Sequence, residues 1–419
     1  MNRYAKDRRK SGGPHPVNSV ELSGKNTKTR FYLTLLFAGV GIALIIRAVL
    51  TAFSSSDGWN EITADSTSEE TDCSEEFYFL YDLGSGDTDA TTENKQLTAL
   101  YTQLCASAYE MFNVDSEGAG SANIYDINHS INEEVTVDAW LYEAFSLMEE
   151  YSDRSLYLGP LYEYYDNVFY CSEDYETEDF DPSANADTAA YYQEIIAYAL
   201  DEDSVSIELL GDNTVRLNVS EEYQAFADAS GFENFIDFYW LKNAFITDYL
   251  ADGLIEEGYT HGCITSYDGF VKNLGDSEET FSYTIYKRVD SDIYQPASIE
   301  YTGAMSIVYL RDYMLSDIDT AHYYEMDDGT TLSCYVDIED GTCKSSISDL
   351  VSYSSEKSCA EILLDIVSVY VTDEWDQTAA LGLSDNSIYV IYSDSETVYY
   401  NDTELYITAE DDWSLQLAN

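Results

Sequence analysis

Two carboxylates, Glu361 and Asp365, lie four residues apart in a stretch whose apolar residues predict a helix from Glu356 to Val371. Residues at this spacing share one face of a helix, so both side chains can reach the same ion. Carboxylate oxygens are the ligands that the hard cations Mg²⁺ and Ca²⁺ prefer. The pair therefore predicts a divalent-cation site. The alternative is a solvated acidic helix face, since the chain contains 80 Asp and Glu.

A third acid, Asp237, directly precedes another predicted helix within the stretch from Ile236 to Gly275. Apolar residues recur there at helical spacing, namely Leu241, Phe245, Leu250, Leu254 and Ile255. Gly258 ends the helix, and a short strand is predicted from Cys263 to Tyr267. An acid at the start of a helix either contacts a ligand or complements the helix dipole, and the sequence leaves both roles open for Asp237.

Several common catalytic patterns are absent from the sequence. It contains no G-x-S-x-G, H-E-x-x-H, P-loop or C-x-x-C motif. The histidines are scattered over the chain, which argues against a histidine-based metal site; they are His15, His129, His261 and His322.

Around Asp237 the sequence resembles the FAD:protein FMN transferase family, the ApbE-type flavin transferases. The family segment runs D-L-G-G-I-A-K-G-Y-A-V-D, then a helix, then N-L-G-G-D-I-R-A-L-G. In the same order this chain has Asp237, Leu241, Phe245, Asp248, Gly269, Leu274 and Gly275. Tyr239-Trp240 replaces the paired glycines, and Asn243 replaces the lysine.

Further marks of the family follow in the family order. Residues 121–128 resemble S-x-L-S-R-L-N, and Gly159-Pro160-Leu161 matches the start of G-P-L-x-x-L-W. Residues 334–341 fall on H-I-I-D-P-x-T-G, with Cys334 in place of the histidine. Residues 360–365, which contain the acidic pair, fall on A-D-A-L-S-T. Leu83-Gly84-Ser85 falls on M-G-T.

The resemblance implies an α+β, T-fold-like ApbE domain with mixed and antiparallel sheets flanked by helices. It implies FAD as the substrate, with Mg²⁺ bridging its pyrophosphate while a Thr or Ser hydroxyl of an acceptor flavoprotein displaces AMP. By the same resemblance, Leu83, Asp237 and Asn243 bind the cofactor. Trp240, through its backbone carbonyl, and the pair Glu361 and Asp365 hold the metal. No catalytic residue carries over.

The departures from the family pattern leave alternatives open. The rings of Tyr239 and Trp240 either plug the pocket or stack on a flavin, because the family has backbone alone at these positions. Lys242 is expected to point away from the position of the lost lysine, because one residue turns about 100° around a helix. The chain is then either an FMN transferase with reduced activity or an inactive ApbE-like module that binds flavin or protein at the cell surface.

Charge restricts the partners of the chain. After Phe53, ten Lys and Arg stand against 78 Asp and Glu, a net charge of −68. Such a surface repels nucleic acid and anionic lipid and attracts cations, so we expect no nucleic-acid partner. A protein at the cell surface that is acidic for reasons unrelated to flavin is a further reading of the composition.

The segment from Phe31 to Phe53 predicts a single membrane helix, since its 23 residues at ~1.5 Å each span roughly 34 Å. The alternatives are a cleaved signal peptide and a buried helix. Residues 1–30 carry eight Lys and Arg against two acids, which predicts a cytoplasmic basic tail. Residues 54–76 read as an acidic linker, and 77–419 as the extracytoplasmic domain of a cell-membrane protein. All seven cysteines fall on the outer side.

Overall fold

The computed structural model describes residues 55–65, 75–86, 88–170, 176–275, 280–289, 292–326, 329–410 and 412–418. The predicted basic tail, 1–30, and the predicted membrane segment, 31–53, lie outside these ranges. None of the helices within them combines the length and the apolar character needed to cross a bilayer.

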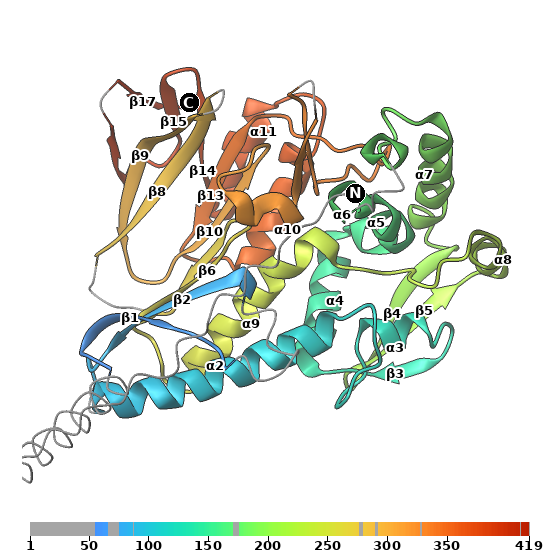
Figure 1. Ribbon diagram of the computed structural model, residues 1–419, viewed down its shortest axis with the longest axis horizontal. Helices are drawn as coiled ribbons and strands as arrows, with labels where there is room; N and C mark the ends of the chain where they lie inside the picture. The colour runs from blue at the N-terminus through green and yellow to red at the C-terminus, as the bar shows by residue number, and fades with distance from the viewer. Residues whose placement is uncertain are drawn as a thin grey trace, which may run out of the picture. The chain divides into compact units, whose positions relative to one another are not determined.

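A nine-stranded sheet lies at the centre of the described chain (Figure 1). Neighbouring strands are antiparallel, except that the last pair is parallel. In spatial order the strands are β1 (Gly58–Ile62), β2 (Phe77–Leu83), β6 (Gly262–Ser266), β7 (Phe270–Asn273), β10 (Ser306–Arg311), β13 (Asp349–Ser354), β14 (Tyr389–Asp394), β15 (Thr397–Tyr400) and β17 (Ser414–Leu417).

Both faces of the sheet are buried. Successive side chains of a strand point to opposite faces, so alternate residues enter two different cores. On β10, Val308 and Leu310 join the larger core, which the helices cover. Ile307 and Tyr309 join a smaller core beneath a second, three-stranded sheet. That sheet consists of β8 (Thr280–Val289), β9 (Asp292–Thr302) and β16 (Tyr406–Ala409).

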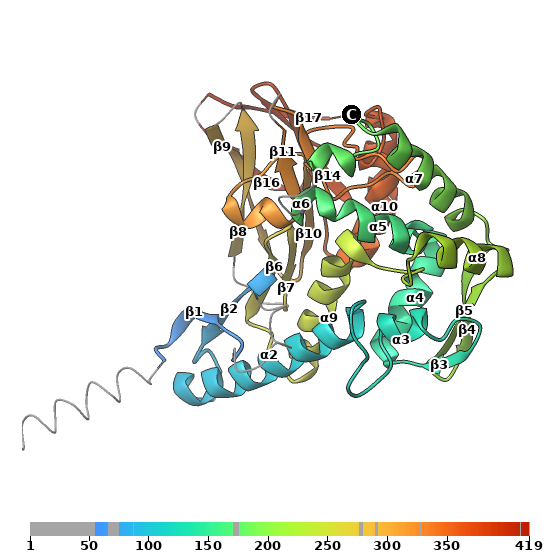
Figure 2. The same ribbon diagram turned by 45° about the vertical axis from the view of Figure 1, so that its right-hand side comes forward.

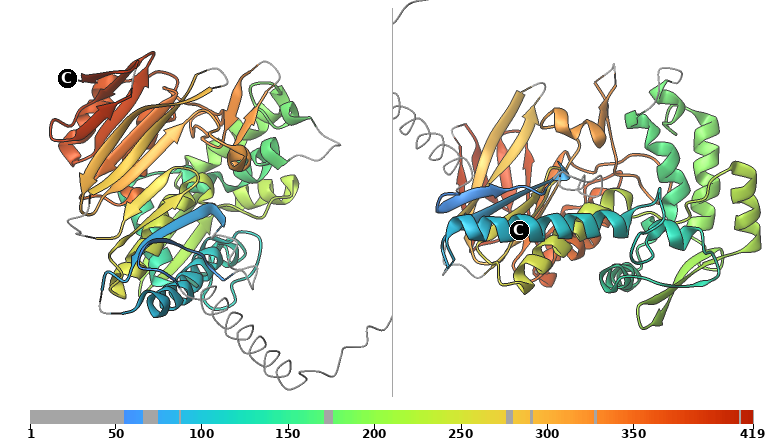
Figure 3. Two further views of the ribbon diagram at one scale, coloured as in Figure 1. Left: turned by 60° about the vertical axis from the view of Figure 1, so that its left-hand side comes forward. Right: turned by 60° about the horizontal axis from the view of Figure 1, so that its bottom comes forward.

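The helices of the larger core are α2 (Ala90–Phe112), α4 (Ala139–Tyr151), α9 (Lys242–Glu256) and α10 (Cys359–Tyr370). The central one is α9, which contacts α2, α10, β6 and β7 (Figure 3). Its buried residues therefore include polar ones, Asn243, Thr247 and Asp248, besides the apolar side chains. Polar groups buried in a core need hydrogen-bond partners, and these partners determine how α9 is held.

The remaining elements lie mostly away from β8 and β9. Figure 2 shows this for α5, α7 and α8. β3, β5 and β4 form a three-stranded sheet, and β11 and β12 form a hairpin. The bounds are α3 (Ile124–Asn128), β3 (Glu134–Thr136), α5 (Gly159–Tyr165), α6 (Asn167–Tyr170), α7 (Ala186–Ala199), β4 (Val205–Gly211), β5 (Thr214–Val219), α8 (Glu221–Ser230), β11 (Tyr323–Glu325), β12 (Thr331–Ser333) and α11 (Gln377–Gly382).

The α+β class with mixed and antiparallel sheets flanked by helices is confirmed. One strand, however, falls inside the stretch whose composition reads as a linker. Residues 58–62 form β1, which pairs with β2 at the edge of the central sheet. Only Ile62 of this strand is fully buried, so its sequence lacks the apolar alternation that reveals a strand. The folded region therefore begins before Phe77.

One buried carboxylate, Asp248 on α9, joins the helices to the sheet. Its Oδ1 accepts the backbone N–H of Cys359 at 3.0 Å, and its Oδ2 accepts that of Ala360 at 2.9 Å. These first-turn N–H groups of α10 have no partner within their own helix. The ammonium of Lys272, on β7, lies 2.8 Å from Oδ1. A single side chain thus fixes α9 against α10 and β7.

Replacing Asp248 with alanine should lower the free energy of unfolding by about 3–5 kcal/mol, because it leaves a largely buried lysine and a helix N-terminus without their partner. Urea denaturation followed by circular dichroism measures the change. Asp252→Ala is the matched control, since Asp252 lies 3.4 Å from the same lysine but its side chain is 44% exposed. The control should cost less than about 1 kcal/mol. Equal losses in the two variants would contradict the role given to Asp248.

Candidate functional site

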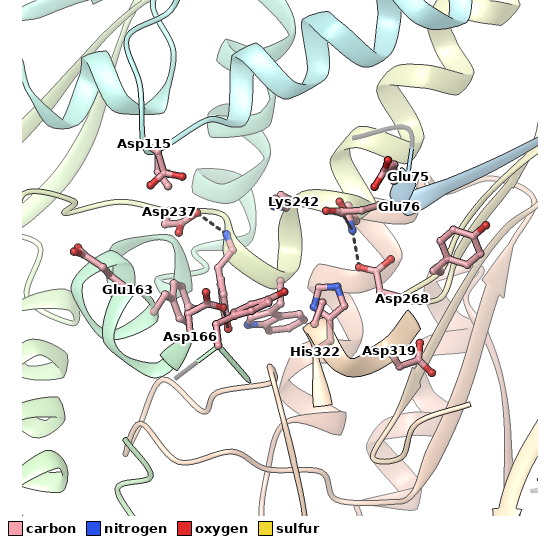
Figure 4. Close-up of a pocket in the computed structure, with 18 of the residues that line it drawn as sticks. Glu75, Glu76, Asp115, Glu163, Asp166, Asp237, Lys242, Asp268, Asp319 and His322 are labelled. Atoms are coloured by element: carbon pink, nitrogen blue, oxygen red, sulfur yellow. Dashed lines mark hydrogen bonds between the residues drawn. The ribbon is translucent and has the colours of Figure 1, made fainter. Parts of the chain in front are cut away.

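A cavity of about 380 Å³ opens at the N-terminus of α9 (Figure 4). Segments far apart in the sequence form it. They are residues before β2, residues after α2, α5 and α6 with the residue between them, the entry to α9, the turn between β6 and β7, and the residues just before β11. Its described lining carries eight carboxylic acids, namely Glu75, Glu76, Asp115, Glu163, Asp166, Asp237, Asp268 and Asp319. Lys242 and His322 are the basic side chains of this lining.

Tyr239 retains a backbone conformation that favours glycine. Its φ is +42°, in the left-handed region, where a residue with a Cβ costs about 1–2 kcal/mol. The resemblance places a family glycine at this position. The Tyr239 hydroxyl donates to Asp166 Oδ1 at 3.1 Å, and its ring stacks on Tyr162 with centroids 4.6 Å apart. These contacts hold the tyrosine in the strained conformation.

The two aromatic residues that replace the glycines differ in their surroundings. Trp240 is 4% exposed, and its ring meets Tyr335 edge-on at 5.3 Å. It therefore fills space where the family has no side chain, in line with the plugging alternative. Tyr239 lines the cavity, but Tyr162 already occupies one face of its ring.

Asp237 lines the cavity and also holds the entry to α9. Its Oδ1 accepts the backbone N–H of Tyr239 at 2.8 Å. Burial raises the pKa of Asp237 to about 6, although the Tyr239 N–H and the charge of Lys242 oppose the increase. The two roles predicted for this acid are therefore compatible, and its carboxyl titrates close to neutral pH.

Asn243 is 2% exposed and joins two carboxylates. Its amide nitrogen donates to Glu76 Oε2 at 2.8 Å and to Asp268 Oδ2 at 2.9 Å. A lysine here would offer a positive charge to a phosphate, whereas the amide is engaged by the protein. Glu76 and Asp268 have no counterpart among the residues predicted for the site.

Lys242 lines the cavity, and the expectation that it points away is wrong. It is the first residue of α9, where its long side chain can extend past the end of the helix instead of following the helix surface. Burial alone would lower the pKa of Lys242, but the nearby carboxylates of Glu76, Asp237 and Asp268 outweigh this effect and raise it. The cavity thus contains a lysine adjacent to the position where the family has one.

His322 enters the cavity from the residue before β11 (Figure 4). Its carbonyl accepts the backbone N–H of Cys334 at 3.0 Å, so the two residues are opposite each other beside the β11–β12 hairpin. Cys334 stands where the family has histidine, but it is 3% exposed and burial raises the pKa of its thiol. His322 therefore places an imidazole in the cavity from the position opposite Cys334.

Leu83, predicted to bind the cofactor, is buried at the far end of β2 and does not line the cavity. Glu76 precedes the near end of this strand, and seven residues at ~3.3 Å each place Leu83 roughly 20 Å farther along. The structure thus brings together Asp237, Trp240 and Asn243 of the predicted residues, and leaves Leu83 apart.

Glu361 and Asp365 have partners of their own outside the cavity. Glu361 forms a capping box with Ser358 at the start of α10 and an ion pair with Lys357 at 3.1 Å. Asp365 accepts the hydroxyl of Tyr151 at 3.3 Å. Across the described ranges, no three His, Cys, Asp or Glu side chains are placed to hold a metal ion. The donor set of Trp240, Glu361 and Asp365 stays a prediction that this geometry does not favour.

Comparison with known proteins identifies the fold. No family model matches the sequence, and no curated protein matches it significantly. The ApbE protein of Thermotoga maritima MSB8 is similar in structure, with a TM-score of 0.53 and 10% identity over 80% of this chain and 93% of that chain. The flavin transferase ApbE of Vibrio cholerae gives a TM-score of 0.50 and 14% identity over 80% of this chain and 94% of that chain.

The chain has the ApbE fold. The fold that the resemblance implied is therefore confirmed, at a sequence identity too low to carry the activity with it. Within this ApbE fold, the cavity at α9 is the place where the hallmark positions Asp237, Trp240 and Asn243 meet Lys242 and His322.

The raised pKa of Asp237 predicts a pH-dependent stability. A carboxyl whose pKa rises on folding stabilises the protein below its unfolded value of 3.8, and this contribution is lost as the pH rises through about 6. Asp237→Asn keeps an acceptor for the Tyr239 N–H but cannot titrate. Relative to this variant, the wild type should lose on the order of 2 kcal/mol of stability between pH 4 and pH 7.

Thermal unfolding of both proteins at several pH values in that window measures the effect. Asp228→Asn, on the exposed surface of α8, controls for the loss of one charge. A pH-independent difference between the wild type and Asp237→Asn would contradict the raised pKa.

Proposed function

We propose that this chain transfers FMN from FAD to a Thr or Ser hydroxyl of a membrane or secreted acceptor flavoprotein. The proposal combines the ApbE fold with the side chains of the cavity. The observation that carries it is the presence of Lys242 and His322 in one cavity. The sequence has lost the family lysine at Asn243 and the family histidine at Cys334. Lys242, adjacent in the chain, and His322, opposite Cys334 in space, provide the same two residue types.

The reaction needs a base for the acceptor hydroxyl and positive charge for the diphosphate. The acceptor oxygen attacks the phosphorus of the FMN moiety, the bond from that phosphorus to the oxygen bridging it to the AMP phosphate breaks, and AMP leaves. His322 takes the proton of the attacking hydroxyl, since an imidazole is the most frequent general base. Lys242 faces the phosphate oxygens, with the N-terminal end of α9 behind it.

The acidic lining works against an anionic ligand, so the proposal includes dependence on a divalent cation. Such an ion neutralises phosphate charge when it is bound. Burial raises the pKa values of Asp166 and Asp268. The proposed activity is consequently weak and depends on the ionic conditions.

The proposed location is the cell membrane. The apolar segment from Phe31 to Phe53 anchors the chain, the basic residues 1–30 stay in the cytoplasm, and the ApbE fold lies outside. An acceptor would then be another membrane or secreted protein, and the seven cysteines would all lie in an oxidising compartment.

A second candidate, a flavin-binding module without transferase activity, is favoured by the bonding of Asn243. Both hydrogen bonds that its amide nitrogen donates go to protein carboxylates, and Trp240 fills space near them. Under this alternative FAD binds but is not cleaved. Catalytic turnover decides between the two.

Replacing His322 with alanine should lower the rate of AMP release from FAD by roughly 100-fold, as expected for the loss of a general base. The assay uses the full chain in detergent with FAD and Mg²⁺, and chromatography quantifies AMP. Water takes the place of the acceptor hydroxyl when no acceptor is present. Mass spectrometry then detects the FMN adduct on an added acceptor flavoprotein domain.

His261→Ala is the matched control, because His261 does not line the cavity. It should leave the rate of AMP release unchanged. Bound FAD that is never cleaved by the wild type would support the second candidate. Equal rates in the wild type and in His322→Ala would exclude His322 as the base.

A further inference from the structure

A second cavity, of about 490 Å³, lies on the face of the central sheet that the helices do not cover. It is bordered by β1, β2, β6 and β7 of that sheet and by β8 of the three-stranded sheet. None of the described residues that line it is charged, although the chain contains 80 Asp and Glu. Its aromatic residues are Trp59, Phe281, Tyr283 and Tyr301. This neutral hollow contrasts with the acidic cavity at α9.

The outer edge of β8 forms one side of the neutral hollow. Residues Thr280–Tyr283 all line it, and successive side chains of a strand point to opposite faces, so the backbone edge itself borders the hollow. β8 is the outer strand of its sheet, and within the described ranges the backbone of Thr280–Ile285 pairs with β9 alone. β1 lies beside β8 in Figures 1 and 2, and the ring of Trp59 meets that of Phe281 edge-on at 5.9 Å.

The first half of β8 lacks the features that normally protect an edge strand. Natural edges carry charged residues, proline or a β-bulge, which prevent pairing with another chain. Thr280–Ile285 contains no charged residue and no proline. The second half is protected, because a bulge lies between Ile285 and Lys287 and the carbonyl of Tyr286 accepts the hydroxyl of Tyr309 at 2.6 Å. An extended segment of another protein can therefore pair with the first half and place its side chains in the hollow.

Charge limits which protein this segment belongs to. A second copy of the chain carries the same net charge of −68 after Phe53, and two such surfaces repel each other. A different protein meets the least repulsion at the neutral hollow. Uncharged surface with Trp, Tyr and Phe is also typical of the core of a protein interface. Trp59, which is 47% exposed, is the residue type most often found to dominate binding energy.

The neutral hollow adjoins the cavity at α9 along β6. Thr265 lines the hollow, and Tyr267, two residues later on the same side of the chain, lines the cavity. At ~3.3 Å per residue, the two positions are roughly 7 Å apart. Tyr267 is 41% exposed, so the surface between hollow and cavity is open to solvent. A protein bound in the hollow can therefore present a hydroxyl to the cavity.

We propose that the neutral hollow and the first half of β8 bind an extended segment of the acceptor flavoprotein. The segment pairs with the backbone of Thr280–Ile285 and covers Trp59. The identity of the partner rests on the proposed function. The surface itself holds the protein substrate and takes no part in the cleavage of FAD.

Binding of an FMN-free acceptor flavoprotein domain to the full chain in detergent, measured by biolayer interferometry, tests this surface. Trp59→Ala should weaken the binding by about tenfold or more, and should raise the KM for the acceptor in FMN transfer by a similar factor. The rate of AMP release from FAD without acceptor should stay unchanged. Tyr406→Ala is the matched control, because Tyr406 is a 60% exposed aromatic residue on β16, the opposite edge of the same sheet. Equal affinity in Trp59→Ala and the wild type would overturn the assignment.

Backbone hydrogen exchange of the wild type gives a readout that does not depend on how a variant folds. The acceptor domain should slow the exchange of residues 280–285 and leave that of β16 unchanged. Unchanged exchange of residues 280–285 would overturn the proposal. Protection that appears without acceptor as the concentration of the chain increases would assign the hollow to a second copy and also overturn it.

The two proposals fail in different ways. If the acceptor domain binds in the hollow but no AMP is released from FAD, only the proposed function fails. If FMN is transferred and Trp59→Ala changes neither affinity nor KM, only the docking surface fails.

Discussion

The carboxylate of Asp248 is the interaction on which the arrangement of the cavity depends. It accepts hydrogen bonds from two N–H groups of α10 and pairs with the ammonium of Lys272, so α9 cannot shift along α10 without leaving these buried groups unpaired. Because α9 is fixed in this way, its first residues reach the turn that carries Asp268 at a constant position. The cavity therefore results from how the core is held together, and its polar side chains project from rigid elements.

Electrostatics then limits what the cavity can bind. Its described lining carries eight carboxylic acids, within a region whose net charge after Phe53 is −68. An anionic ligand enters such a site only when protons, a metal ion or basic side chains compensate the charge. Lys242 supplies a positive charge in this cavity, and burial raises the pKa of Asp237 to about 6.

Hydrophobic periodicity is sufficient to predict α9 and α10, since both helices bury apolar stripes against the sheet. The order of short motifs was sufficient to predict the fold. The site was harder to predict because its residues are brought together by pairing between strands. His322 precedes Cys334 by twelve residues, and only the β11–β12 register shows that they are opposite. Glu76 belongs to a stretch that composition assigns to a linker. Leu83 lies apart from the cavity because the direction of β2 carries it away.

The most direct test of the central claim is a fluorescence titration of FAD with the full chain, because flavin emission changes when the nucleotide binds. AMP is quantified in the same samples, since cleavage of FAD also changes the emission. We expect saturable binding at one site, weakened roughly tenfold or more in Lys242→Gln, which removes the charge proposed to face the phosphates. Lys95→Gln, on the exposed face of α2, should bind FAD as the wild type does. Absence of saturable FAD binding by the wild type, or equal affinity in Lys242→Gln, would contradict the assignment of this cavity as the flavin nucleotide site.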